Sequence, residues 1–81
     1  MLEELARAQR VVGVKQSRKA LLEGRAAQVF LARDADPALT GPLADECARQ
    51  AVPVVRDFSM EQLGRACRIT VGASVAVVLR A

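Results

Sequence analysis

Histidine is absent from this 81-residue chain, and its absence excludes whole classes of site. Neither a catalytic Ser–His or Cys–His pair nor a metal site with histidine ligands can form. Tryptophan and tyrosine are also absent, and the aromatic residues are Phe30 and Phe58. The core must therefore consist mainly of Val, Leu and Ala. The scarcity of aromatic side chains argues against a base-stacking platform of the RRM or OB type.

Cysteine occurs twice, at Cys47 and Cys67, and the two residues form no CxxC pair. We expect both to be buried, reduced and free of metal, and we expect no cofactor. No apolar run approaches the roughly 20 residues that a membrane span needs. The acidic, amphipathic start of the chain is unlike a signal peptide. These features predict a cytoplasmic protein that does not associate with membranes.

The length fits one domain covering residues 1–81, with a single compact core supplied by the 52% of hydrophobic residues. Capping residues and hydrophobic spacing predict four helices that alternate with four strands. In chain order, these are a helix over 2–10, a strand at 11–12, a helix over 16–23, a strand over 27–32, a helix over 37–50, a strand over 52–56, a helix over 60–67 and a strand over 74–79. This alternation predicts an α/β fold with a mostly parallel sheet and helices on both faces.

Several residues predict the ends and buried faces of these helices. Gly24 is expected to end the second helix, Asp36 to cap the third, and Ser59 with Gln62 to form a capping box for the fourth. The residues expected to face the core are Ala20, Leu21 and Leu22 in the second helix and Leu39, Leu43, Cys47 and Ala48 in the third.

Charge is unevenly distributed along the chain. Residues 7–33 contain seven basic groups and one acidic group, whereas residues 34–61 contain two basic and six acidic groups. A segregated basic face on a small domain favours a polyanionic partner. The alternative is a solvated helix face whose charge bias is incidental.

The densest polar cluster lies where the first strand turns into the second helix. A helix start offers unpaired backbone N–H groups to a phosphate. Lys15 and Gln16 could reach base edges in a nucleic-acid groove, and Lys19, one turn later, could reach a phosphate. The alternative is a capped helix start with solvated charges. The cluster consists of Gly13, Val14, Lys15, Gln16, Ser17, Arg18 and Lys19, and it does not match a P-loop.

A second unusual segment, which we call the apolar loop, comprises Ile69, Thr70 and Val71. Its two large apolar side chains either enter the core or form an exposed lip against which an unstacked RNA base could pack. Asp34 follows the second strand, where functional loops of α/β sheets lie, but a turn residue is the competing interpretation. The sequence contains no nucleophile–base pair, Gly-rich phosphate loop or metal ligand set, so we expect no catalytic residues and no enzyme.

Taken together, several stretches resemble the L7Ae/L30e ribosomal protein superfamily of kink-turn RNA binders, and most closely its short bacterial members. The resemblance covers about residues 9–79. The stretches that carry it are Val12–Gln16, Lys19–Ala20, Gly24, Val29–Pro37, Val52–Val54, Ser59, Leu63–Ala66 and Val71–Ala73.

The resemblance implies a three-layer α/β/α sandwich around a four-stranded mixed sheet. It also implies binding to a kink-turn, a sharply bent RNA helix in which tandem G·A pairs adjoin a three-nucleotide bulge. In the family, the residues at positions 13, 15 and 16 contact the guanine edges and Lys19 contacts the backbone. The apolar loop covers the bulge, and Asp34 lies at the edge of that surface. The full candidate RNA-binding set is Gly13, Val14, Lys15, Gln16, Arg18, Lys19, Arg33, Asp34, Arg68, Ile69, Thr70 and Val71.

The chain departs from many members at two places. Lys15 and Gln16 stand where archaeal and eukaryotic members commonly have Asn-Glu, and Gly72 stands where others have proline. Our hypothesis is a non-catalytic, monomeric protein that binds kink-turn RNA on the ribosome or on a regulatory RNA, without a small-molecule substrate. The alternative is a protein-interaction module on the same fold with only generic RNA affinity.

Overall fold

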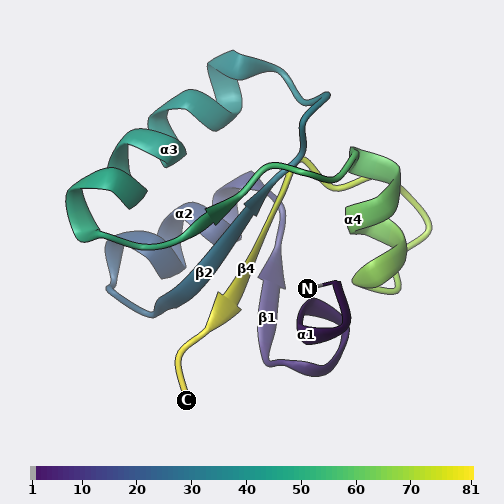
Figure 1. The fold of residues 1–81 in the computed structure, drawn as a ribbon, viewed down its shortest axis with the longest axis horizontal. Coiled ribbons are helices and arrows are strands. Elements are labelled where there is room, and N and C mark those ends of the chain that lie inside the picture. The colour runs from purple at the N-terminus through teal and green to yellow at the C-terminus, as the bar shows by residue number, and fades with distance from the viewer. Residues whose placement is uncertain (1) are drawn as a thin grey trace.

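The computed structural model describes residues 2–81; Met1, the first residue of the expected 1–81 domain, lies outside this range. Within it, four helices alternate with four strands as predicted (Figure 1). The elements are α1 (Leu2–Arg7), β1 (Arg10–Val12), α2 (Val14–Leu22), β2 (Ala26–Leu31), α3 (Pro37–Gln50), β3 (Val54–Val55), α4 (Met60–Ala66) and β4 (Val75–Leu79).

The four strands form one mixed sheet in the order β1-β4-β2-β3. Strand β4 is antiparallel to both β1 and β2, and only β2 and β3 are parallel. The expectation of a mostly parallel sheet is therefore wrong, whereas the mixed sheet is confirmed. The physical reason is that the loop after α4 returns to the end of the sheet where β2 finishes. Strand β4 must therefore start at that end and run opposite to β2. Val75 at the start of β4 pairs there with Leu31 at the end of β2.

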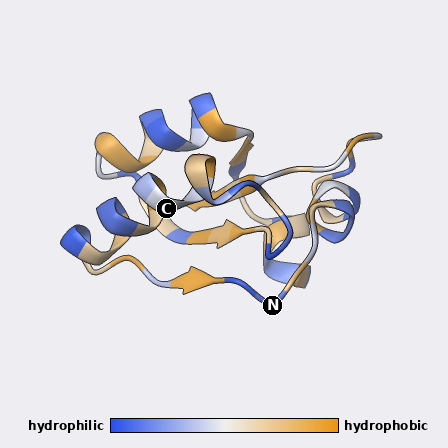
Figure 2. Ribbon diagram, turned by 90° about the horizontal axis from the view of Figure 1, so that it is seen from above, coloured by the Kyte–Doolittle hydropathy of each residue, from blue (hydrophilic) through white to orange (hydrophobic). Residues whose placement is uncertain are grey.

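Helices cover both faces of the sheet and give the predicted three layers (Figures 1 and 2). Helices α2 and α3 pack on one face, where their side chains and those of β2 and β4 form one apolar cluster. Helices α1 and α4 pack on the other face around Phe30, Leu5 and Leu63. The strands are predominantly apolar between amphipathic helices, as Figure 2 shows. The α/β/α sandwich is thus confirmed.

The predicted helix caps are confirmed. The Asp36 carboxylate accepts a hydrogen bond from the Ala38 N–H at 2.9 Å, with Pro37 as the first helical residue. Ser59 and Gln62 form the reciprocal capping box at the start of α4. Gly24, with φ of 72°, ends α2, because its N–H and that of Arg25 bond back to the last turn.

The buried faces of α2 and α3 differ from the prediction. Leu22 is 57% exposed and Leu39 is 45% exposed, and Ala48 is exposed as well. In α3 the core face consists of Thr40, Leu43 and Cys47. These residues follow the helical spacing of i, i+3 and i+7, so choosing only hydrophobic residues missed the buried threonine.

The two cysteines are buried and free, as predicted. Cys47 lies in the cluster under α2 and α3, and Cys67 lies in the cluster on the opposite face of the sheet. Burial is the main cause that raises the pKa of both thiols. The sheet between them prevents a disulfide.

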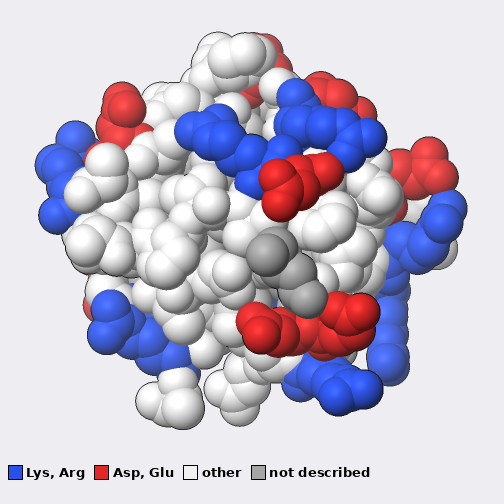
Figure 3. All heavy atoms as spheres, in the orientation of Figure 1, with Lys and Arg blue, Asp and Glu red and all other residues white. Residues whose placement is uncertain are grey.

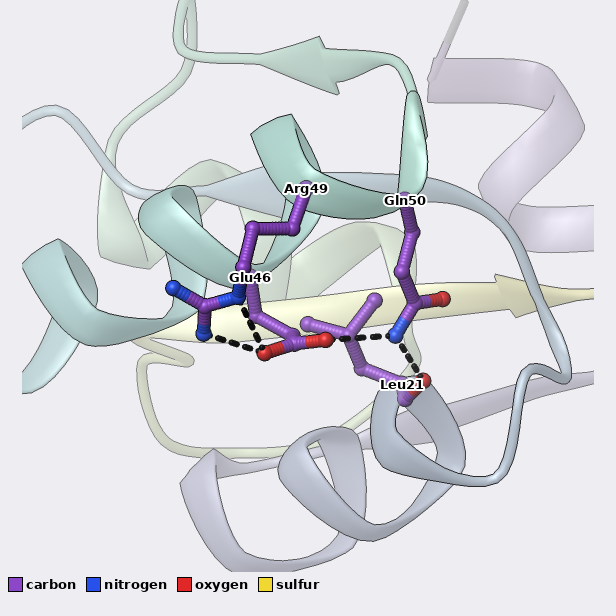
Figure 4. A network of polar contacts seen from close by, with 4 residues as sticks. All are labelled: Leu21, Glu46, Arg49 and Gln50. Atoms are coloured by element: carbon purple, nitrogen blue, oxygen red, sulfur yellow. Dashed lines mark hydrogen bonds and ion pairs between the residues drawn. The ribbon is translucent and has the colours of Figure 1, made fainter.

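A polar network ties α3 to the end of α2 (Figure 4). The Gln50 side-chain N–H group donates to the Leu21 carbonyl at 2.8 Å and to the Glu46 carboxylate at 2.8 Å. Arg49 pairs with the other oxygen of Glu46. Gln50 thereby bonds a carbonyl of the last turn of α2 and fixes this helix against α3.

Candidate nucleic-acid interface

Three segments that are distant in sequence meet at one edge of the sheet. The Gly13 N–H donates to the Val75 carbonyl at 2.9 Å, which places the start of α2 beside the start of β4. The Ala32 N–H donates to the Ser74 carbonyl at 2.9 Å, which brings in the end of β2. The apolar loop, which precedes β4 by three residues, packs on α4 and lines a pocket with Asp34 at this end of the sheet. The structure thus brings together the start of α2, residues 33–34 and the apolar loop.

Gly13 determines where α2 begins. Its backbone has φ of 95° and ψ of 159°, a region that is essentially open only to glycine. Its carbonyl accepts the first helical hydrogen bond, from the Ser17 N–H, and no side chain caps the helix. Helix α2 therefore starts two residues earlier than predicted. The N–H groups of residues 14–16 precede that first bond and have no acceptor within the helix.

The polar side chains at this helix start point outward. Lys15, Gln16, Arg18 and Lys19 are all exposed. The first turn of α2 contains no acidic residue, and across residues 2–81 none of the three cations lies within ion-pair distance of a carboxylate. The N-terminal end of α2 is therefore positive through both its charges and its helix dipole.

Basic groups do not form one uninterrupted patch on the side of the molecule that faces the viewer in Figure 1. On the side shown in Figure 3, basic and acidic groups lie close to one another. Ion pairs between arginine and glutamate neutralise Arg25, Arg49 and Arg65. Arg25 belongs to the basic stretch 7–33, and its partner Glu23 is the single acidic residue of that stretch. The three cations on α2 have no carboxylate partner within residues 2–81.

Val14 and Ser17 contribute to packing. Val14 is half-buried against the core cluster beneath α2 and α3. It also lines a shallow groove between these two helices, together with Arg18, Leu22 and Leu39. Ser17 is buried, and within the described part of the chain its hydroxyl has no hydrogen-bond partner. The side chains of α2 available to a ligand are therefore those of Lys15, Gln16, Arg18 and Lys19.

The structure resolves the two interpretations of the apolar loop in favour of an exposed lip. Val71 is 69% exposed and Ile69 is 38% exposed, and Thr70 is exposed too. Val71, Met60 and Asp34 line a shallow pocket beside the loop. An apolar surface at the edge of a polar site is suited to an unstacked base.

Arg33 and Asp34, which follow β2, connect this strand to α4. The Arg33 guanidinium donates to the Asp57 carbonyl at 2.6 Å and to the Gln62 side-chain oxygen at 3.3 Å. The Asp34 carboxylate accepts from the Met60 N–H at 2.8 Å. Both residues lie at the expected edge, but their observed contacts are structural, and direct RNA contact remains a prediction for them.

Arg68 occupies a strained position just after α4. Its φ of 62° is uncommon for a residue other than glycine. The N–H groups of Arg68 and Ile69 bond back to the Arg65 and Gly64 carbonyls, which ends α4 in a Schellman motif. Its side chain is exposed, and Arg68 lies three residues before Val71 in the same segment between α4 and β4.

Sequence analysis missed the residues that hold the apolar loop in place, namely Met60, Gly64 and Gly72. The available signal was Gly64 itself, because a glycine inside a helix is costly and often has a packing reason. No group of three or more potential metal-ligating side chains occurs within residues 2–81, and no helix there has the length and apolar character needed to cross a membrane.

The α/β/α layers, together with a polar helix start and an exposed apolar loop at the same end of the sheet, define a small ribosomal-protein-like domain. The chain belongs to the ribosomal protein L7Ae/L30e/S12e/Gadd45 family, whose model matches residues 2–81. The predicted family is therefore confirmed.

Individual relatives support this assignment. The chain is 41% identical over 70 residues to the RNA-binding protein YbxF of Geobacillus stearothermophilus, covering 86% of this chain and 85% of that protein. It is 43% identical, with the same coverage, to an RNA-binding protein of Geobacillus sp. (strain WCH70). Among solved structures, the Giardia lamblia 15.5kD RNA binding protein matches with a TM-score of 0.86 and 31% identity, covering 99% of this chain and 68% of that one.

Proposed function

We propose that this protein is a non-catalytic RNA-binding protein that recognises kink-turn RNA. The observation that carries the proposal is the meeting of two unlike surfaces at one sheet edge. The start of α2 presents Lys15, Gln16 and Lys19, and the neighbouring loop presents Val71. The RNA-binding names of the bacterial relatives support the proposal.

The two surfaces suit two parts of a kinked RNA. Ordinary A-form RNA has a deep, narrow major groove that side chains cannot read, and a kink opens it locally. The side-chain amide of Gln16 can then donate to and accept from base edges, while lysines contact phosphates. The apolar loop covers nucleotides that have left the stack. Binding favours the kinked RNA over its extended form, so the RNA's deformation energy contributes to specificity.

We further propose that the protein acts as a monomer on a ribosomal or regulatory RNA. The alternative function, a protein-interaction module, is favoured by one observation, the exposure of Leu22 and Leu39 beside the groove between α2 and α3. Titration against a kink-turn RNA and against an RNA without the tandem G·A pairs distinguishes these two functions.

The variant Val71→Asp tests the proposed site. A carboxylate on the loop would repel RNA phosphates and remove the apolar contact, so we expect kink-turn binding to be largely lost. Because Val71 is 69% exposed, we expect the fold to remain intact by circular dichroism. Leu39→Asp is a matched control: it adds the same charge at a position that is 45% exposed, on α3. Equal effects of the two substitutions would show that only net charge matters.

A further inference from the structure

The backbone of the apolar loop lies directly on α4 at Gly64. A Cβ atom placed on Gly64 would lie 2.1 Å from the Val71 carbonyl oxygen and 3.1 Å from the Gly72 Cα. The first distance is far inside van der Waals contact, and the opposing atom belongs to the backbone and cannot rotate away. The loop can therefore occupy this place only when residue 64 has no side chain.

Met60, one turn earlier on the same face of α4, holds the other end of the loop. The Ala73 N–H donates to the Met60 carbonyl at 3.0 Å. A Cβ on Gly72 would lie 3.1 Å from the Met60 Cβ, so the loop packs tightly here as well. Two contact points on one helix face thus determine the path of residues 71–73.

Asp34 in turn fixes the helix that carries these contacts. Its carboxylate accepts from the Met60 N–H at 2.8 Å, which links the first turn of α4 to the end of β2. Strand β2 pairs directly with β4, the strand that follows the apolar loop. The position of Val71 relative to the sheet edge is therefore set by α4 through Asp34 and Gly64.

We propose that Gly64 and Asp34 are positioning residues for RNA binding, which act by fixing Val71 at the same end of the sheet as the start of α2. This inference rests on the proposed function. It assigns part of the protein's affinity for kink-turn RNA to residues that contact the apolar loop or its supporting helix. Since Val71 and the α2 side chains must engage one RNA together, a displaced loop loses its contact while α2 keeps its own.

The first test is Gly64→Ala, with affinity measured by titration against a kink-turn RNA. We expect affinity to fall about tenfold, comparable to losing one good base contact. The matched control is Gly41→Ala, another glycine-to-alanine change within a helix, at a position where a Cβ meets nothing within 4 Å. This control should bind like the unmodified protein. A folded Gly64→Ala variant with unchanged affinity would overturn the role of Gly64.

A double-mutant cycle separates positioning from general weakening. If Gly64→Ala acts by moving the loop, adding Val71→Ala should cost little more, because the contact of Val71 is already lost. Adding Lys19→Ala should instead weaken binding by its full, independent factor. Additive effects of Gly64→Ala and Val71→Ala would contradict the proposal.

Asp34 provides a test in which positioning and charge act in opposite directions, and which holds if Gly64→Ala fails to fold. Removing a negative charge should strengthen RNA binding if Asp34 acts only electrostatically. Positioning predicts that Asp34→Ala weakens binding several-fold and that Asp34→Asn restores it, because the amide oxygen can accept the same Met60 hydrogen bond. Binding by Asp34→Ala as tight as that of the unmodified protein would overturn the role of Asp34.

The unmodified protein separates failure of this inference from failure of the proposed function. If it binds kink-turn RNA no better than a control duplex, the proposed function fails and the positioning role fails with it. If it discriminates between the two RNAs and the Gly64 and Asp34 variants do so equally well, only the positioning role fails.

Discussion

Gln16 is exposed in the first turn of α2, where its side chain is free to read a base edge. We expect Gln16→Ala to weaken binding to kink-turn RNA by about 1–3 kcal/mol and to reduce discrimination in favour of G·A pairs. Affinities for a kink-turn RNA and for one lacking G·A pairs, measured side by side, check this. Lys19→Ala is the comparison, since loss of a phosphate contact should weaken both RNAs equally. An equal loss on both RNAs from Gln16→Ala would contradict base reading.

Packing does not require glycine at position 13, because a Cβ there would meet nothing within 4 Å. The requirement comes from the backbone conformation of Gly13. We expect Gly13→Ala to lower the free energy of unfolding by about 1–3 kcal/mol, since φ of 95° with ψ of 159° is strained for alanine. Urea unfolding measures this change. Gly41→Ala should be neutral or slightly stabilising, because Gly41 lies in a helix with open space around it. Similar free energies of unfolding for the two variants would show that alanine adopts the backbone conformation of position 13 without strain.

At the scale of single residues, the helix caps were predictable from the sequence, whereas the exposure of Leu22 and Leu39 was not. Lys15, Gln16 and Lys19 were correctly placed on an exposed helix start. Asp34 was predicted at the RNA-binding edge, and the structure shows its carboxylate bonded to the Met60 N–H. A contact between residues 26 positions apart leaves no local pattern, so spacing alone could not reveal it.

Among the secondary-structure elements, the contact between α2 and α3 has a specific polar component in Gln50. We expect Gln50→Ala to lower the free energy of unfolding by about 1 kcal/mol, because its hydrogen bond to the half-buried end of α2 is lost. Urea unfolding checks this, with Arg65→Ala as the control. Arg65 forms an exposed pair with Glu61, so its removal should change stability by a few tenths of a kcal/mol. Equal free energies of unfolding for the two variants would show that the Gln50 hydrogen bond does not stabilise the contact between α2 and α3.

The same network predicts a dependence on pH. The hydrogen bond from Gln50, and then that from Arg49, lowers the pKa of Glu46 from its ordinary 4.5. A carboxyl with a depressed folded-state pKa stabilises the protein above its unfolded pKa, and this contribution disappears as the pH falls through the folded value. The effect of Gln50→Ala should therefore be smaller at a pH well below 4.5 than at neutral pH. An effect that does not change with pH would exclude the Glu46 contribution.

The helices and strands were predictable because their signals are local. Asp36 with Pro37, Ser59 with Gln62, and Gly24 each mark a helix end within a few residues, and all three were confirmed. The buried face of α3 was less predictable, because Leu39 lies on the exposed side and Thr40 on the buried side. Which of two adjacent residues is buried depends on how the helix sits against the sheet.

At the scale of the whole molecule, strand direction was the main error of the pattern-based analysis. Alternating helices and strands favour parallel pairing, but β4 enters the middle of the sheet antiparallel to both neighbours. The cause is that the loop after α4 returns to the first turn of this helix, where the Ala73 N–H donates to the Met60 carbonyl, so β4 starts at the end of the sheet where β2 finishes. The mixed sheet came from the family resemblance, which rests on residues dispersed from Val12 to Ala73.

Which charged side chains have partners could be seen only in the folded chain. The sequence predicts a basic face from residues 7–33; in the structure Arg25 pairs with Glu23, the one acidic residue of that stretch, and Arg33 donates to Gln62 of α4. The cations on α2 remain without a carboxylate partner in the described chain. We therefore expect RNA affinity to fall with rising salt, while specificity depends on the G·A pairs and the bulge.

The most direct measurement is titration of the unmodified protein, at about physiological salt, against two short RNAs. One contains a standard kink-turn, and in the other Watson–Crick pairs replace the tandem G·A pairs. The account predicts tight binding to the first RNA and much weaker binding to the second. Equal, weak and salt-sensitive binding to both would contradict kink-turn recognition and favour a protein-interaction module.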